Sequence, residues 1–287
     1  MKKQLLATLG VGAIGIASYA ATFMQVVTND GSIVEYDVEN VSEVNFVKKE
    51  VVVPQDTTPS SNHTYVDLGL PSGTLWATYN IGATKPEEYG DYFAWGETEP
   101  KEVYDWSTYK YAKASGAWDL DSLTKYNFGN YYDGVVDSLS TLLPEDDAAT
   151  ANWGSEWRMP TIEEQRELIE ECYWVWTNGY NGSDVSGHIV YKAKNENDKG
   201  KVSYPGGNYE SEDYSLADAH VFFPAAGYRF GSGVDGVGDD GSYWSSSLLE
   251  KSESYARYLD FIEEYAGWNY DSFRRIGFPV RAVRAQK

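Results

Sequence analysis

The sequence predicts a fold of short β-strands with few helices, and three observations support this class. Apolar alternation recurs in short segments that Gly, Asn, Asp and Pro interrupt, as is typical of strands joined by turns. Helical patterns are confined to a few short stretches. The 287-residue chain also contains 24 Tyr, 10 Trp and 10 Phe, which is enough bulk to fill a core without further cross-links.

The N-terminus has the pattern of a secretory signal peptide. Lys2 and Lys3 precede an apolar run over residues 5–17, and small residues follow up to Ala20. We therefore predict a signal peptide over residues 1–20 and an exported protein at the cell surface, in the periplasm or outside the cell. No membrane insertion is expected after cleavage. An uncleaved anchor is the alternative, although the apolar run is short for a bilayer.

Residues 22–53 predict a small β unit. An Asn-Asp-Gly turn signal at residues 29–31 separates an apolar strand from the alternating strand over residues 33–38. A third short strand is expected over residues 42–47. The unit resembles a leader module common in exported proteins of the Bacteroidetes.

A linker over residues 54–63, rich in Pro, Ser and Thr, leads into one larger domain over residues 64–287. The clearest helix of this domain begins at Thr161. Thr161 and Glu164 have the spacing of a capping box, in which each side chain satisfies a backbone amide at the helix start. A second, shorter helix is expected near residues 148–152.

The charge balance argues against polyanionic partners. The formal charge is -21 at pH 7, and loss of Lys2 and Lys3 with the leader makes it more negative. Nucleic acid and anionic lipid select basic surfaces, so neither is expected as a partner. The single cysteine, Cys172, allows no intrachain disulfide, so the core must stabilise an exported chain alone.

Several motifs follow one another through the larger domain. They are Val66-Asp67-Leu68-Gly69-Leu70-Pro71-Ser72-Gly73-Thr74-Leu75-Trp76-Ala77, Tyr89-Gly90-Asp91-Tyr92-Phe93-Ala94-Trp95-Gly96-Glu97, Trp157-Arg158-Met159-Pro160-Thr161, Phe223-Pro224-Ala225-Ala226-Gly227-Tyr228-Arg229, Tyr243-Trp244-Ser245-Ser246-Ser247 and Val280-Arg281. In this order they resemble the Fibrobacter succinogenes major paralogous domain, over nearly the whole larger domain.

That family in turn resembles the C-type-lectin-like fold of formylglycine-generating, or sulfatase-modifying, enzymes and of the variable proteins of diversity-generating retroelements. The Arg158-Met159-Pro160-Thr161 segment is similar to the helix entry of the sulfatase-modifying group. The resemblance implies an α+β class, with one or two helices on small antiparallel sheets and long loops that carry the binding face.

Enzyme activity is not expected. The sulfatase-modifying enzymes use cysteine chemistry near their C-terminal region, whereas Cys172 falls on the apolar side of the predicted helix. A buried structural thiol is the better interpretation, since Cys is among the most buried residue types. The sequence also contains no nucleophile elbow, no phosphate loop and no recognisable pair of hydrolytic carboxylates.

No cofactor or metal is expected either. Residues 235–241 are acidic and rich in Gly, as flexible calcium loops are, but they lack the spacing of an EF-hand. The Glu-Pro-Asn and Gln-Pro-Asp triplets of calcium-dependent lectins do not occur. A plain turn between strands is the better interpretation. The three histidines lie far apart in the sequence, which disfavours zinc.

Residues 243–284 mix aromatic side chains with Ser, Asn, Gly and Arg, which is typical of surfaces that grip ligands. The resemblance implies that residues 243–247 and 278–284 are mainly scaffold. It also implies a binding surface in this region, as in the retroelement variable proteins. Residues 264–273 have no clean period and are expected as a loop that either faces a ligand or tucks onto the core. The predicted ligand-binding residues are Trp244, Tyr255, Arg257, Trp268, Tyr270, Phe273 and Arg274.

Together these features predict a secreted or cell-surface adhesion module that binds a glycan or protein through aromatic C-terminal loops. Stacking and hydrogen bonds would provide affinity, with Arg257 or Arg274 available for cation–π contacts or acidic groups. Two alternatives stay open. One is a structural subunit of a surface assembly, paired through the N-terminal β unit or an edge strand. The other is a degenerate relative of the formylglycine-generating enzymes.

Overall fold

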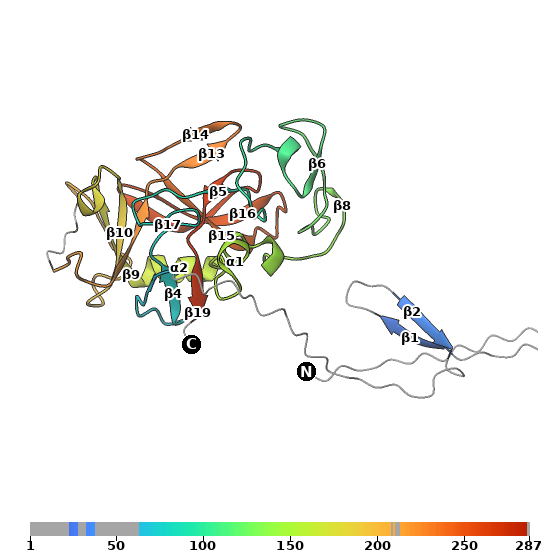
Figure 1. The fold of residues 1–287 in the computed structure, drawn as a ribbon, viewed down its shortest axis with the longest axis horizontal. Coiled ribbons are helices and arrows are strands. Elements are labelled where there is room, and N and C mark those ends of the chain that lie inside the picture. Colours follow the sequence, from blue (N-terminus) through green and yellow to red (C-terminus); the bar gives the residue numbers. More distant parts are fainter. Residues whose placement is uncertain (1–22, 28–32, 38–62, 208, 210–212, 286–287) are drawn as a thin grey trace, which may run out of the picture. The chain divides into compact units, whose positions relative to one another are not determined.

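The computed structural model describes residues 23–27, 33–37, 63–207, 209 and 213–285 of the chain. The chain divides into two compact units, Met1–Asp56 and Thr57–Lys287. In the first unit, β1 (Phe23–Val27) pairs antiparallel with β2 (Ile33–Asp37), which confirms the two predicted hairpin strands (Figure 1). The predicted signal peptide, the hairpin turn, the third strand and the linker up to residue 62 lie outside the described residues.

The second unit is mostly β, with a few short helices and several small antiparallel or mixed sheets. Its strands are β3 (Tyr65–Val66), β4 (Thr74–Ala77), β5 (Tyr92–Phe93), β6 (Ala112–Ala114), β7 (Leu120–Leu123), β8 (Asp133–Gly134), β9 (Cys172–Thr177), β10 (Gly187–Lys192), β11 (Val202–Ser203), β12 (His220–Pro224), β13 (Tyr228–Phe230), β14 (Gly233–Asp235), β15 (Gly241–Leu248), β16 (Tyr255–Ile262), β17 (Tyr265–Phe273), β18 (Phe278–Pro279) and β19 (Val283–Ala285). Its helices are α1 (Ala148–Trp153), α2 (Ile162–Glu171) and the short 3-10 helices η2 (Trp106–Thr108), η3 (Pro144–Asp146) and η4 (Tyr180–Gly182).

The strands form small sheets rather than one continuous layer. The largest sheet has the order β11-β9-β10-β12, in which only the β11–β9 pair is parallel. Three-stranded sheets have the orders β15-β16-β17, β19-β4-β3 and β6-β7-β8, and β13 pairs with β14 as β18 does with β5. In the part of the chain that the structure describes, no helix is long and apolar enough to cross a membrane.

Both predicted helices are present, and α2 begins at its predicted cap. The Thr161 hydroxyl accepts a hydrogen bond from Glu164 N at 3.2 Å, and the Glu164 carboxylate accepts one from Thr161 N at 2.9 Å, which completes the capping box of α2. Asp147 caps α1 by accepting from two amides of its first turn. Helix α2 ends at Glu171, so Cys172 opens strand β9 and does not continue the helix as predicted.

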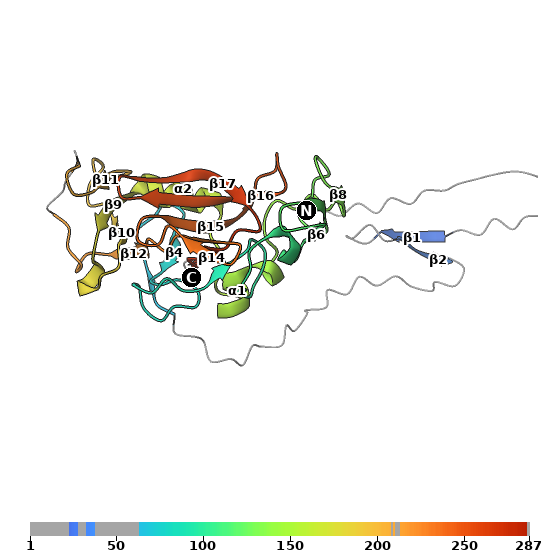
Figure 2. The same ribbon diagram turned by 90° about the horizontal axis from the view of Figure 1, so that it is seen from above.

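The sheet β15-β16-β17 lies at the centre of the second unit, between α2 and the β13–β14 hairpin (Figure 1). Leu259 and Phe261 of β16 pack on the side of Leu168 from α2. Trp244 and Ala256 pack on the other side, in the cluster that contains Trp95 and Phe278. Figure 2 shows β15, β16 and β17 side by side, with β17 as the outer strand. This placement fixes which side chains of β16 and β17 face the core.

Candidate ligand-binding surface

The segment over residues 264–273, expected as a loop, is instead largely the nine-residue strand β17. Its register with β16 shifts between Tyr258 and Asp260, where a β-bulge interrupts the pairing. A bulge puts an extra residue on one strand and so breaks the alternation of side chains. The aromatic residues therefore show no clean period, although the segment is a paired strand.

Two of the predicted binding residues belong to the interior, which corrects their expected place on the surface. Trp244 is 0% exposed, and its Nε1 donates to the Phe93 carbonyl at 2.9 Å. Arg274 is also 0% exposed, and its guanidinium donates to three backbone carbonyls and to the Tyr109 hydroxyl. Both side chains are fully used within the core and cannot contact a ligand.

The other five predicted residues lie at separate places around β16 and β17. Arg257 Nη1 donates to Asn269 Oδ1 at 3.1 Å, and Arg166 of α2 lies over the Trp268 ring at 5.6 Å. The rings of Tyr255 and Phe273 pack against each other with their centroids 4.3 Å apart. Tyr270 pairs across the strands with Tyr258, 5.8 Å between ring centroids. The structure therefore does not bring the predicted residues into one site.

Tyr258, Asp260, Tyr265 and Tyr270 form what we name the tyrosine surface, on the face of the sheet turned away from α2. Tyr258 stands opposite Tyr270, and Asp260 stands opposite Gly267. The Tyr265 side chain is 46% exposed, whereas the other three members are half-buried. The rings of Tyr265 and Tyr270 meet edge to face at 6.1 Å. Of these four residues, only Tyr270 was predicted, because alternation along β16 did not show which side faces the core.

Gly267 lets Tyr265 lie across the strand. A Cβ atom at Gly267 would stand 2.1 Å from the Tyr265 hydroxyl oxygen and 2.6 Å from Cζ of the same ring. The ring therefore occupies the space that any other residue at position 267 would fill. Because Gly267 has no side chain, one face of the Tyr265 ring lies against the strand, and the rest of the ring is accessible.

Asp260 gives the tyrosine surface a hydrogen-bond acceptor. Its carboxylate accepts from the Ser242 hydroxyl at 2.8 Å, and no Lys or Arg of the described ranges forms an ion pair with it. Burial, offset in part by the Ser242 hydrogen bond, raises the pKa of Asp260 to about 6, and the nearby charge of Asp240 adds to the increase. The surface thus combines apolar ring area with a carboxylate that has no cation partner in the described part of the chain.

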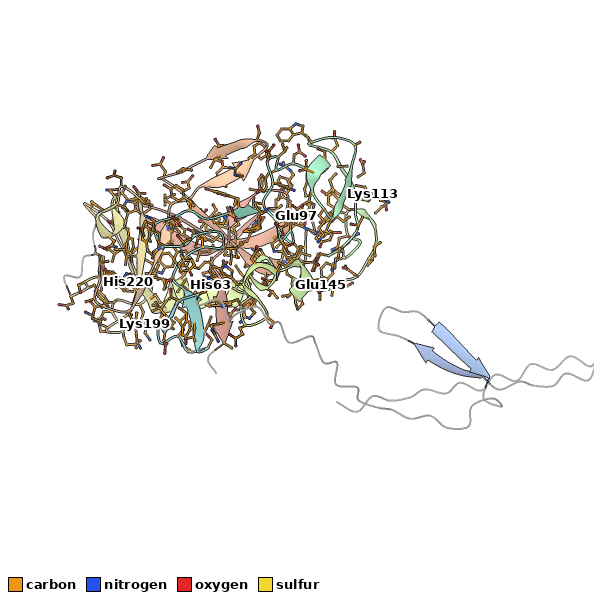
Figure 3. The ribbon with its side chains drawn as sticks, in the orientation of Figure 1. His63, Glu97, Lys113, Glu145, Lys199 and His220 are labelled. Carbon is orange, nitrogen blue, oxygen red and sulfur yellow. The ribbon has the colours of Figure 1, made fainter. Side chains whose placement is uncertain are left out.

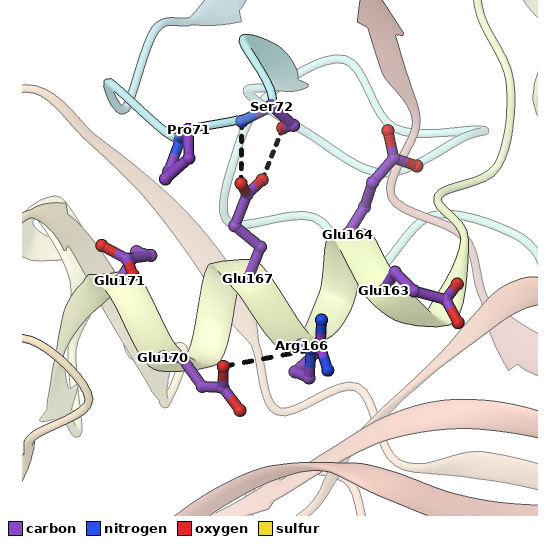
Figure 4. Close-up of a pocket in the computed structure, with 8 residues that line it drawn as sticks. All are labelled: Pro71, Ser72, Glu163, Glu164, Arg166, Glu167, Glu170 and Glu171. Carbon is purple, nitrogen blue, oxygen red and sulfur yellow. Dashed lines mark hydrogen bonds and ion pairs between the residues drawn. The ribbon is translucent and has the colours of Figure 1, made fainter.

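A groove of about 300 Å³ runs along α2, and Figure 4 shows its lining. It is lined by Pro71, Ser72, Glu163, Glu164, Arg166, Glu167, Glu170 and Glu171. The Glu167 carboxylate accepts from Ser72 N at 2.8 Å and from the Ser72 hydroxyl, so it attaches α2 to the turn before β4. Arg166 pairs with Glu170 at 3.9 Å. These contacts give Glu167, Arg166 and Glu170 structural partners within the protein.

A second cavity, of about 280 Å³, adjoins the edge strand β12. His220, labelled in Figure 3, lines it together with Tyr180, Asp218 and Phe222. The Asp218 carbonyl lies 2.8 Å from His220 Nδ1, and the Tyr180 hydroxyl lies 2.9 Å from Nε2. The Tyr180 ring is stacked on Phe222 at 4.0 Å, so this cavity has an aromatic wall, and both ring nitrogens of His220 already have partners.

Within the described residues, no three His, Cys, Asp or Glu side chains are grouped so that they could hold a metal ion. Residues 236–240 form a turn between β14 and β15, in which Asp239 N and Asp240 N both donate to the Gly236 carbonyl. Cys172 is buried, and burial raises the pKa of its thiol far above the usual value. A thiol in this environment is not activated as a nucleophile.

Comparison with known proteins returned no match for this chain among family models, curated proteins or solved structures. The resemblance to the Fibrobacter succinogenes major paralogous domain and the C-type-lectin-like fold therefore stay predictions. The function of the chain is therefore inferred from the geometry of the tyrosine surface.

Proposed function

We propose that the second unit is a glycan-binding module and that the tyrosine surface is its binding site. This proposal rests on three tyrosine rings beside Asp260, of which Tyr265 is exposed and the other two are half-buried. Asp260 forms no ion pair with a Lys or Arg among the described residues. Sugars present apolar C–H faces that stack on aromatic rings, and their hydroxyls donate to carboxylates in charge-assisted hydrogen bonds. Export to the cell surface and a C-type-lectin-like fold belong to the same proposal, and the sequence motifs and the capped helix α2 support them.

Tyr265→Ala is expected to weaken glycan binding about tenfold, which corresponds to the loss of roughly 1.4 kcal/mol of stacking. Gly267→Ala should weaken binding as well, because its Cβ would displace the Tyr265 ring while leaving the tyrosine in the chain. Titration calorimetry against the glycan selected from a broad carbohydrate panel measures both effects. Neither variant is expected to change the melting temperature by more than a few degrees.

Tyr131→Ala is the matched control, because Tyr131 is 72% exposed and precedes β8, outside the residues of the tyrosine surface. Its affinity should equal that of the wild type. Glycan binding that survives in Tyr265→Ala and Gly267→Ala alike would contradict the assignment of this site. Absence of any glycan ligand, together with concentration-dependent polymerisation, would favour a subunit of a surface assembly instead.

Glycan affinity is expected to fall as the pH drops through about 6. The pKa of Asp260 is raised to about 6, so the carboxylate that accepts the sugar hydroxyl becomes protonated there. The free energy of unfolding changes with pH in the opposite direction, because the folded state disfavours ionisation of Asp260. The contribution of Asp260 to stability is therefore present below its unfolded pKa and is lost as the pH rises through 6. Asp260→Asn should bind independently of pH between 5 and 8, as calorimetry at several pH values would show.

A further inference from the structure

Three buried arginines lie in the C-terminal segment, and one of them, Arg275, has two donor atoms without a hydrogen-bond partner among the described residues. Arg274 donates to four groups, as described above, and Arg281 donates to the Asn80 side chain and to the carbonyls of Ala77 and Phe222. Arg275 is 4% exposed, yet its Nε and Nη1 are buried without any hydrogen-bond partner among the described residues. A buried donor that stays unpaired costs about 1–3 kcal/mol. Arg275 therefore retains two unsatisfied donors, which a ligand can reach only when a neighbouring side chain moves aside.

Aromatic rings surround this guanidinium. Its central carbon lies 5.6 Å from the ring centroid of Trp106, 5.3 Å from Trp118, and 5.0 Å from both Phe230 and Phe273. Cation–π contacts of this kind stabilise the charge but leave the N–H groups unsatisfied. We name this arrangement the arginine cage.

No carboxylate completes the arginine cage from within the described part of the chain. Burial lowers the pKa of Arg275, and the attraction of the Asp105 carboxylate offsets only part of this decrease. The Asp105 carboxylate itself is committed to the cap of η2, where Oδ1 accepts from Thr108 N at 3.1 Å and from the Ser107 hydroxyl at 2.7 Å. The buried Nε and Nη1 of Arg275 are thus left without a carboxylate partner among the described residues.

Trp118 is the accessible wall of the arginine cage. Its side chain is 68% exposed, although its ring lies 5.2 Å from Phe230 and covers the guanidinium. Exposed side chains change rotamer within picoseconds to nanoseconds, so movement of this single indole can open the path to Arg275.

We propose that Arg275 and Trp118 form a second ligand site, which takes the carboxylate of an acidic sugar such as a uronic acid. The carboxylate would accept charge-assisted hydrogen bonds from the guanidinium, while the Trp118 and Phe230 rings stack on the sugar. The net charge of -21 opposes any anion at long range, so recognition depends on these short-range contacts. The site goes beyond the tyrosine surface and shares no residue with it.

The test compares glucuronate, glucose and acetate as ligands of the full chain, with tryptophan fluorescence and calorimetry as readouts. Glucuronate should bind about tenfold or more tightly than glucose, as charged hydrogen bonds to Arg275 require. Arg275→Gln should abolish this preference. Trp118→Ala should weaken glucuronate binding but preserve acetate binding, because it removes the stacking ring and leaves the guanidinium. Arg166→Gln, at an exposed arginine of α2 that belongs to neither site, should change nothing.

Equal affinity for glucuronate and glucose in the wild type would overturn the proposal, as would unchanged glucuronate binding in a folded Trp118→Ala variant. If Arg275→Gln does not fold, the Trp118→Ala variant still tests the proposal. Capture of an acidic peptide without glucuronate binding would also overturn it. Tyr265→Ala should leave glucuronate binding intact, so failure of the tyrosine surface and failure of the arginine cage are distinguishable.

Discussion

Arg274→Ala is expected to lower the free energy of unfolding by about 3–5 kcal/mol, because it removes a buried, fully hydrogen-bonded charge. The guanidinium donates to the Tyr109 hydroxyl at 2.9 Å and to the carbonyls of Lys125, Tyr126 and Glu253 at 3.1, 3.1 and 2.9 Å. These acceptors come from distant parts of the chain, and the variant leaves them buried without a donor. Urea denaturation followed by circular dichroism measures the loss.

Arg257→Ala is the control for this experiment. The Arg257 side chain is 27% exposed and contacts Asp271 at 3.8 Å on the surface, so its removal should change stability by less than about 1 kcal/mol. A loss below that value for Arg274→Ala as well would contradict the structural role assigned here. We expect Arg274→Ala to reduce ligand binding only under conditions in which the variant unfolds.

The helices could be predicted because their signals are local. Thr161 and Glu164 are three residues apart, and the capping box that they form depends on no other part of the chain. Asp147 likewise caps α1 through amides two and three residues further on. The strands β1 and β2 are separated by a turn signal that is equally local.

The candidate site could be predicted only in its general location, because long-range packing decides which side chains are accessible. Arg274 and Arg275 are neighbours in sequence, yet one is fully paired and the other is not. Alternation along β16 separates Tyr258 and Asp260 from Leu259, but only the position of α2 determines which set is covered. The bulge between β16 and β17 also breaks the alternation of side chains, so the sequence predicts an irregular loop where the structure has a strand.

The same dependence on long-range partners makes Asp146 a second critical residue. Its carboxylate, 2% exposed, accepts from the hydroxyls of Tyr111 and Tyr126, the latter at 2.7 Å, and from Lys125 Nζ at 2.5 Å. Asp146→Ala leaves these donors without their acceptor, and we expect it to lower the free energy of unfolding by about 3 kcal/mol. Thermal and urea denaturation at pH 7 measure this loss.

The pH dependence of the free energy of unfolding distinguishes the contribution of the Asp146 charge from that of its side-chain shape. Burial opposes its ionisation, but the hydrogen bonds from Lys125, Tyr111 and Tyr126 outweigh it and lower the pKa of Asp146. A lowered pKa means that the stabilisation is present above the unfolded value of about 3.9 and is lost as pH falls through the folded pKa. Asp146→Asn keeps the shape without the charge, so its deficit relative to wild type should be largest near pH 6 and shrink below about pH 4. A deficit that is constant with pH would show that the side chain stabilises the fold through packing and neutral hydrogen bonds alone.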